Sequence, residues 1–151
     1  MNVRILIPLL LAIALLPLLA GCGGGGGDST PPATTITATL DSAGLVTLTA
    51  ENLANVAGME ITLYYDSQTL SNPQVTQGAL VSQGISASNT DTAGIVRIVA
   101  VTSQAFPGTG TIATIAFTPV GSASGRILSL TANLIDVQTN SLAAQVVVVN
   151  P

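Results

Sequence analysis

The chain has 151 residues, of which 48% are hydrophobic and only 7% are charged, and its formal net charge is −4. It contains no histidine and no lysine, which excludes a serine–histidine triad, a Schiff-base lysine and a histidine-bound zinc ion. Nucleic-acid-binding proteins need a basic surface to neutralise phosphates, and three basic residues against seven carboxylates do not supply one.

The first 21 residues have the pattern of an export signal. Arg4 precedes an apolar run over residues 5–20, and small residues follow before Cys22. The run is shorter than the roughly 20 residues of a membrane-spanning helix, and Pro17 interrupts it. The pattern therefore predicts a secretory signal peptide over residues 1–21.

The segment Leu18–Cys22 has the sequence Leu-Leu-Ala-Gly-Cys and resembles the lipobox of bacterial lipoproteins. In that class the cysteine receives a diacylglycerol, the signal is cut before it, and the new amine is acylated. The resemblance implies that Cys22, the only cysteine, is the lipidated first residue of the mature protein. Gly23 follows, where an aspartate would favour the inner membrane, so we expect anchoring in the outer membrane of the cell envelope. An ordinary signal peptide followed by a free cysteine is the alternative.

A tether is expected after Cys22. Residues 23–27 are all glycine, and residues 28–35 are rich in threonine and proline. Polyglycine has no side chains to bury and behaves as a flexible coil, which the prolines stiffen at its end. We therefore assign residues 22–35 to the lipidated cysteine with its tether and residues 36–151 to a folded domain.

The folded part has the pattern of an all-β protein. Short runs rich in valine, isoleucine and threonine are separated by glycine, asparagine, aspartate, serine and proline. The predicted strands cover residues 36–40, 45–50, 58–65, 73–77, 84–88, 94–102, 110–118, 126–134 and 145–149. No window sustains a helical period with caps, and the spacing of the strands is typical of a β-sandwich.

The strand at residues 58–65 alternates between apolar and polar side chains, which indicates one face on a core and one facing outward. Its predicted inward residues are Met59, Ile61, Leu63 and Tyr65, and its outward residues are Glu60, Thr62 and Tyr64. Ile112, Ile115 and Phe117 are also typical of a core, but their spacing implies either a β-bulge or one residue that lies between the sheets. We expect Val146–Val149 to form a buried closing strand.

Asp66 follows a predicted strand and precedes Leu70. Its carboxylate can accept hydrogen bonds from the backbone amides that follow, so we expect it to have a structural role in a turn. Calcium is the alternative, but calcium takes six or more oxygen ligands, commonly from carboxylates clustered in sequence. Because the acidic residues here are dispersed, we expect no metal and no cofactor. Asn89 and Asp91 are the best candidates if calcium does bind.

The order of these landmarks resembles the cohesin domain. In chain order the landmarks are Val46–Ala50, Tyr65-Asp66 with Leu70, Gly78, Asn89, Gly94–Val99, Gly108–Gly110, Ile115–Phe117, Leu128–Leu130 and Asp136. The resemblance covers roughly residues 40–149. It implies a nine-stranded jelly-roll β-sandwich that binds dockerins, which are small calcium-loaded helical modules, in polysaccharide-degrading assemblies on cell surfaces.

The resemblance also implies where a partner docks, namely on the sheet face that contains the strand ending at Tyr65-Asp66. In the best-known type of cohesin this strand offers an asparagine and an aspartate, and the matching positions here are Gly58 and Glu60. A mostly flat face with tyrosine and arginine suits a protein interface. The predicted partner-binding residues are Glu60, Thr62, Tyr64 and Arg97.

We therefore expect a non-catalytic, lipid-anchored binding module with a dockerin-like protein partner. Two alternatives stay open: a polysaccharide-binding module, and a structural envelope lipoprotein without a dockerin partner. Flat polysaccharide-binding faces use rows of exposed aromatic rings, whereas this chain has no tryptophan and Tyr64 alone faces outward. A pair of catalytic carboxylates would need a sugar cleft, for which a small filled sandwich leaves little room.

Replacing the lipid acceptor tests the anchor. The Cys22→Ala variant should escape the lipoprotein signal peptidase and carry no acyl label, because the thiol is the group that receives the diacylglycerol. Metabolic labelling with a fatty acid and mass spectrometry of the mature N-terminus measure both effects. Gly23→Ser keeps the thiol and should still be labelled. Cleavage of Cys22→Ala at the same bond, or a wild-type protein without lipid, would contradict the prediction.

Overall fold

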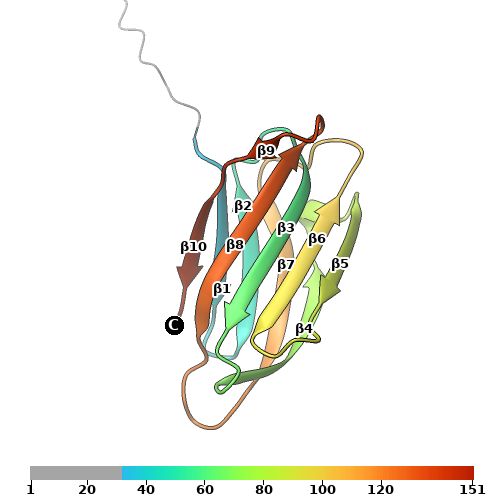
Figure 1. Cartoon of the computed structure of the whole chain (residues 1–151). Coiled ribbons are helices and arrows are strands. Elements are labelled where there is room, and N and C mark those ends of the chain that lie inside the picture. The colour runs from blue at the N-terminus through green and yellow to red at the C-terminus, as the bar shows by residue number, and fades with distance from the viewer. Residues whose placement is uncertain (1–31) are drawn as a thin grey trace, which may run out of the picture. The chain divides into compact units, whose positions relative to one another are not determined.

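The computed structural model describes residues 32–151. This part of the chain contains ten strands and one short 3₁₀ helix (Figure 1). They are β1 (Thr35–Leu40), β2 (Leu45–Glu51), β3 (Val56–Tyr65), β4 (Leu70–Gln77), η1 (Ala79–Val81), β5 (Ile85–Asn89), β6 (Ile95–Val101), β7 (Gly110–Pro119), β8 (Ile127–Asp136), β9 (Ser141–Leu142) and β10 (Gln145–Val149). All nine predicted strands are present. The tenth, β9, has two residues and is too short to show an alternating pattern.

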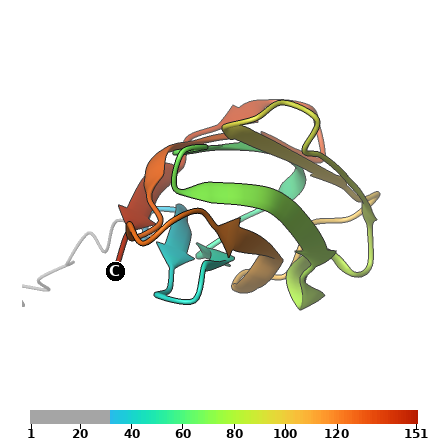
Figure 2. The same cartoon turned by 90° about the horizontal axis from the view of Figure 1, so that it is seen from below.

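The strands form two five-stranded sheets that pack face to face (Figure 1 and Figure 2). One sheet has the order β10-β1-β2-β7-β4, and the other has the order β5-β6-β3-β8-β9. The expected all-β sandwich is thereby confirmed. β1 and β10 run parallel, whereas the other neighbouring strands run antiparallel. Within residues 32–151, no helix has the length and apolar character needed to cross a membrane.

The core lies between the two sheets, and β3 contributes a continuous row to it. Met59, Ile61, Leu63 and Tyr65 are at most 4% exposed, which confirms the predicted inward face of this strand. They pack in one cluster with inward residues of the opposite sheet. One such contact joins Tyr65 to Phe117, whose ring centroids lie 4.7 Å apart in a tilted arrangement.

β7 contains the predicted bulge. Leu48 of β2 pairs with Ala113 and the next residue, Thr49, pairs with Thr111, so Ile112 is an extra residue without a partner in β2. A bulge of this kind turns two consecutive side chains toward the same region. Ile112 and Ala113 are both buried, with at most 1% exposed. The irregular spacing of apolar residues in this strand therefore has a local cause.

β10 differs from the buried strand expected over Val146–Val149. It is the edge strand of its sheet and pairs with β1 alone. Val146, Val147 and Val149 are consequently 40–44% exposed, and only Val148 packs against the core.

Asn150 ties this edge to the other sheet. Its Oδ1 accepts a hydrogen bond from the backbone N–H of Ile127 at 2.7 Å, and its Nδ2 donates one to the carbonyl of Ile127 at 3.1 Å. The side-chain amide thus satisfies both backbone groups of the first residue of β8, as a neighbouring strand would.

Three turns are held by an aspartate at the end of a strand. Asp41 Oδ1 accepts hydrogen bonds from the amides of Ala43 and Leu45, Asp66 Oδ1 from that of Gln68, and Asp136 Oδ1 from those of Gln138 and Asn140, all at 2.8–2.9 Å. The Asn140 side chain also donates to Asp136 Oδ2 at 2.9 Å. This side-chain hydrogen bond, with the two backbone amides, holds the pKa of Asp136 below its usual value. These carboxylates are therefore engaged within their own turns.

Truncation of a core residue of β3 should be far more costly than truncation of its outward neighbour. Ile61→Ala should lower the free energy of unfolding by about 2–5 kcal/mol, because Ile61 is fully buried and its loss leaves a cavity. Glu60→Ala, on the exposed side of the same strand, should change it by less than about 0.5 kcal/mol. Chemical denaturation measures both values, and equal losses would contradict the assignment of the two faces.

Removal of the Asp66 carboxylate should destabilise the turn after β3. Asp66→Ala should cost about 1 kcal/mol, because the amide of Gln68 loses its acceptor. Ser67→Ala, in the same turn, is the control and should change the melting temperature little. Added calcium should leave the melting temperature of the wild type unchanged. A calcium-dependent increase that Asp66→Ala abolishes would instead identify Asp66 as a calcium ligand.

Candidate docking face

The residues predicted to bind a partner share the outer face of the sheet that contains β3 and β6, which lie side by side (Figure 1). Glu60, Thr62 and Tyr64 lie on the same side of β3, because every second residue of a strand points the same way. Thr62 lies directly opposite Arg97 of β6. Side chains in such a cross-strand pair have Cβ atoms about 4.5–5.5 Å apart. The fold therefore brings all four residues onto one surface.

These four residues differ in how far they reach the surface. Glu60 and Arg97 are exposed, and Tyr64 is half-buried. Thr62 is only 8% exposed, less than the alternation of β3 implies. It lies in a central strand with Arg97 across from it on one side and Thr131 of β8 on the other, so its neighbours flank it on both sides. The Thr62 side chain is thus largely covered by its neighbours, whereas the side chains of Glu60, Tyr64 and Arg97 are more accessible to a partner.

One end of this face is apolar, a feature that was not predicted from the sequence. Ile85 of β5, Val101 of β6 and Ile135 of β8 form one row across the sheet with Gly58 of β3 between the last two. They are 76%, 44% and 38% exposed, and Val99 beside them is 42% exposed. A Cβ atom on Gly58 would lie 2.7 Å from Cγ1 of Ile135. The glycine therefore lets aliphatic side chains from both neighbouring strands cover β3.

The other end of the face is polar. Among residues 32–151, no carboxylate oxygen lies within the 4.0 Å of an ion pair from the Arg97 guanidinium. Asn89 of β5 lies opposite Arg97, and its Nδ2 donates a hydrogen bond to Asp91 Oδ2 at 3.0 Å. The two calcium candidates are thus bonded to each other. In the same range, no three histidine, cysteine or acidic side chains come together as a metal site would require.

The arrangement is suited to contact with another macromolecule. An apolar row, a half-buried tyrosine, one exposed arginine and one exposed glutamate lie on a sheet surface of four strands. Protein interfaces typically combine an apolar centre with tyrosine and arginine anchors. Cys22, the predicted lipidation site, lies outside the described residues.

Comparison with known proteins identifies the fold. The family model described as the cohesin domain matches residues 32–150. No curated protein gives a match.

Solved structures of cohesins resemble the chain at low sequence identity. A non-cellulosomal cohesin from the archaeon Archaeoglobus fulgidus has a TM-score of 0.64 and 18% identity, covering 79% of this chain and 93% of that one. The sixth cohesin of scaffoldin B from Acetivibrio cellulolyticus, solved with a mutant Cel5 dockerin, has a TM-score of 0.62 and 15% identity, covering 79% and 100%. The cohesin of the Coh-OlpC–Doc435 complex from Clostridium thermocellum has a TM-score of 0.59 and 15% identity, covering 78% and 91%.

The family model spans nearly all of the described residues, and the overall fold is similar to that of the solved cohesin structures. The chain belongs to the cohesin domain family and is a non-catalytic binding module.

Proposed function

We propose that this cohesin docks a dockerin-like protein on the outer face of strands β5, β6, β3 and β8. The observation that carries the proposal is the composition of that face, where an exposed apolar row adjoins Glu60, Tyr64 and Arg97. Two of the structurally similar cohesins were solved in complex with dockerins, which supports a partner of this class.

The two ends of the face are complementary to different chemical groups of a partner. Burial of Ile85, Val101 and Ile135 would supply hydrophobic free energy, so the partner should offer aliphatic side chains there. Arg97 has no ion-pair partner among residues 32–151, so it can bind a carboxylate of the partner in a two-point contact. The partner should therefore be apolar at one end of its contact surface, with an acidic group opposite Arg97 and a basic group opposite the exposed Glu60.

Gly58 and Glu60 favour a partner different from that of the best-known cohesins. Where those cohesins present an asparagine, this chain has a glycine covered by aliphatic neighbours. A polar group of the partner would lose its hydrogen bond at that position and would be desolvated without compensation. Specificity in this cohesin thus depends on shape and apolar contact at Gly58 and on charge at Glu60 and Arg97.

The proposal includes anchoring in the bacterial cell envelope through a lipid on Cys22, with the outer membrane as the expected site. It is supported by the sequence Leu18–Cys22, the small residue at Gly23 and the glycine-rich stretch that precedes the folded part. A lipid-anchored cohesin would hold its partner at the cell surface or within the envelope without catalysing a reaction.

The full chain used as bait in a lysate of the source organism tests the function. The retained protein should contain duplicated calcium-binding loops of the dockerin type, and a chelator should release it, because dockerins are calcium-loaded. If no protein with such loops is retained, the dockerin part of the proposal fails.

Substitutions on the face test the location. Glu60→Arg combined with Tyr64→Ala should weaken binding of that partner by roughly 30-fold or more, since it reverses a charge and removes an aromatic anchor. Isothermal titration calorimetry measures the affinity, and thermal unfolding checks that the variant is folded. Glu51→Arg makes the same charge reversal on the opposite sheet and should leave binding unchanged. Unchanged affinity in the folded double variant would place the interface elsewhere.

A further inference from the structure

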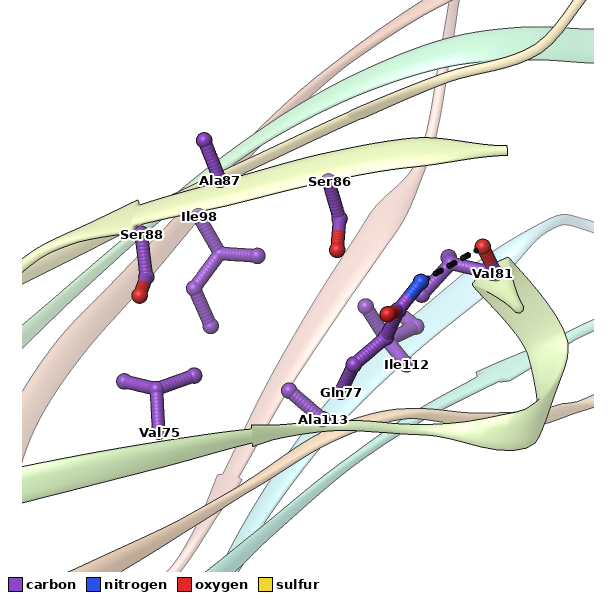
Figure 3. A pocket seen from close by; sticks show the side chains of 9 residues that line it. All are labelled: Val75, Gln77, Val81, Ser86, Ala87, Ser88, Ile98, Ile112 and Ala113. Atoms are coloured by element: carbon purple, nitrogen blue, oxygen red, sulfur yellow. Dashed lines mark hydrogen bonds between the residues drawn. The ribbon is translucent and has the colours of Figure 1, made fainter. Parts of the chain in front are cut away.

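A second candidate site lies between the two sheets, away from the docking face. β4 and β5 are edge strands of different sheets, and a cavity of about 220 Å³ opens between them (Figure 3). The apolar part of its wall consists of Val75, Val81, Ala87, Ile98, Ile112 and Ala113. Gln77 of β4 and Ser86 and Ser88 of β5 supply its polar side chains.

The two serines differ in chemistry from the inward residues of the neighbouring strand. They lie on the inner side of β5, opposite Ala100 and Ile98 of β6, which are at most 3% exposed. At such inward positions the neighbouring strands have apolar residues. Figure 3 shows both hydroxyls pointing into the cavity, and among the residues that line it the only side-chain hydrogen bond joins Gln77 to the carbonyl of Val81. Both serine hydroxyls can therefore bond to a molecule inside the cavity.

The wall of the cavity is held in place before any ligand binds. Gln77 Nε2 donates to the carbonyl of Val81 at 2.9 Å, and the amide of Gly78 donates to the carbonyl of Ile112 at 2.8 Å. A Cβ atom on Gly78 would lie only 2.2 Å from the carbonyl oxygen of Thr111, so the chain passes there in very close contact with β7. These contacts fix η1 at one end of the cavity, and a fixed wall reduces the entropy lost on binding.

The lining restricts the ligand. None of the lining side chains is charged, which disfavours nucleotides and other anions or cations. Hydroxyl groups both donate and accept hydrogen bonds, as do the hydroxyls of a sugar. The volume is below the roughly 300–1,000 Å³ of pockets for drug-sized ligands, so it suits a single small ring. A pyranose ring has one apolar face of C–H groups and an edge of hydroxyls, which complements the aliphatic wall and the two serines.

An extended peptide fits the site less well. It would add a strand to β4 or β5 through backbone hydrogen bonds. Part of the β4 edge is interrupted, because the pairing with β7 shifts between Ser71 and Gln74, Asn72 has a positive φ of 49° and Pro73 has no amide hydrogen. The inward hydroxyls of β5 also favour a hydroxyl-rich ligand over aliphatic side chains.

We propose that the cavity between β4 and β5 binds one pyranose unit of a neutral polysaccharide. Without an aromatic ring to stack on the sugar, a single unit should bind in about the millimolar range. The sugar would lie between the sheets, and a protein partner would lie on the outer face, so each can bind while the other site is occupied.

Methyl NMR of the full chain tests the site, with the protein kept in dodecylphosphocholine, a detergent without a sugar. D-glucose, D-mannose and D-xylose are titrated separately to about 50 mM, well above the expected dissociation constant. At least one should shift the methyl signals of Val75, Ile98 and Ile112. D-glucuronate, which is charged, should shift them less. The Ser86→Ala/Ser88→Ala variant should weaken binding at least about fivefold, because both hydrogen bonds are lost.

Ser129→Ala, on the outer face of β8, is the matched control and should bind sugar as the wild type does. The methyl spectrum of each variant without ligand shows whether it is folded. The proposal fails if none of the three neutral sugars shifts the cavity methyls, or if the serine variant binds them as tightly as the wild type. It also fails if a capped Thr-Val-Thr-Val peptide shifts these methyls and the sugars do not, because the cavity would then bind peptides. Binding of a dockerin-type partner should be unaffected by the serine substitutions, so the two proposals fail independently.

Discussion

Burial of one side of β3 against the opposite sheet is the constraint on which the rest of the structure depends. Because side chains alternate along a strand, Met59, Ile61 and Leu63 in the core require Glu60 and Tyr64 on the other side. A slip of one residue would turn the aliphatic row outward and bury a glutamate, at a large cost in free energy. The same hydrophobic burial that stabilises the sandwich therefore determines which residues form the docking face.

The alternation of side chains also makes β5 contribute to both candidate sites. Its outward residues Ile85 and Asn89 lie at the apolar and polar ends of the docking face, and its inward residues Ser86 and Ser88 line the cavity. A strand at the edge of a sheet can accept hydroxyls on its inner side, since the two sheets no longer enclose it fully. The edge position of β5 therefore explains why its outward residues belong to the docking face while its inward serines line the cavity.

The local features of this fold were predictable from the sequence, and the features that depend on distant pairing were not. The two faces of β3 and the bulge at Ile112 follow from spacing within single strands. The row of Ile85, Val101 and Ile135 depends on the register of four strands, although the shared parity of Arg97 and Val101 was a usable signal. The burial of Thr62 and the exposure of β10 depend on strand order, which places one strand at the centre and the other at an edge. The cavity forms because the edge strands β4 and β5 lie on the same side of the sandwich. No pattern within a single strand predicts that arrangement.

The parallel pairing of β1 and β10 places the start of the first strand and the end of the last strand at opposite ends of the sandwich. Parallel neighbours begin at the same end, so the chain joins the sandwich at Thr35 at one end and completes β10 at Val149 at the opposite end (Figure 1). The docking face lies along the flank between these two ends, on strands that run along the same length of the molecule. An attachment at the N-terminal end would therefore leave the flank open to the side, and a partner could approach without passing the point of attachment.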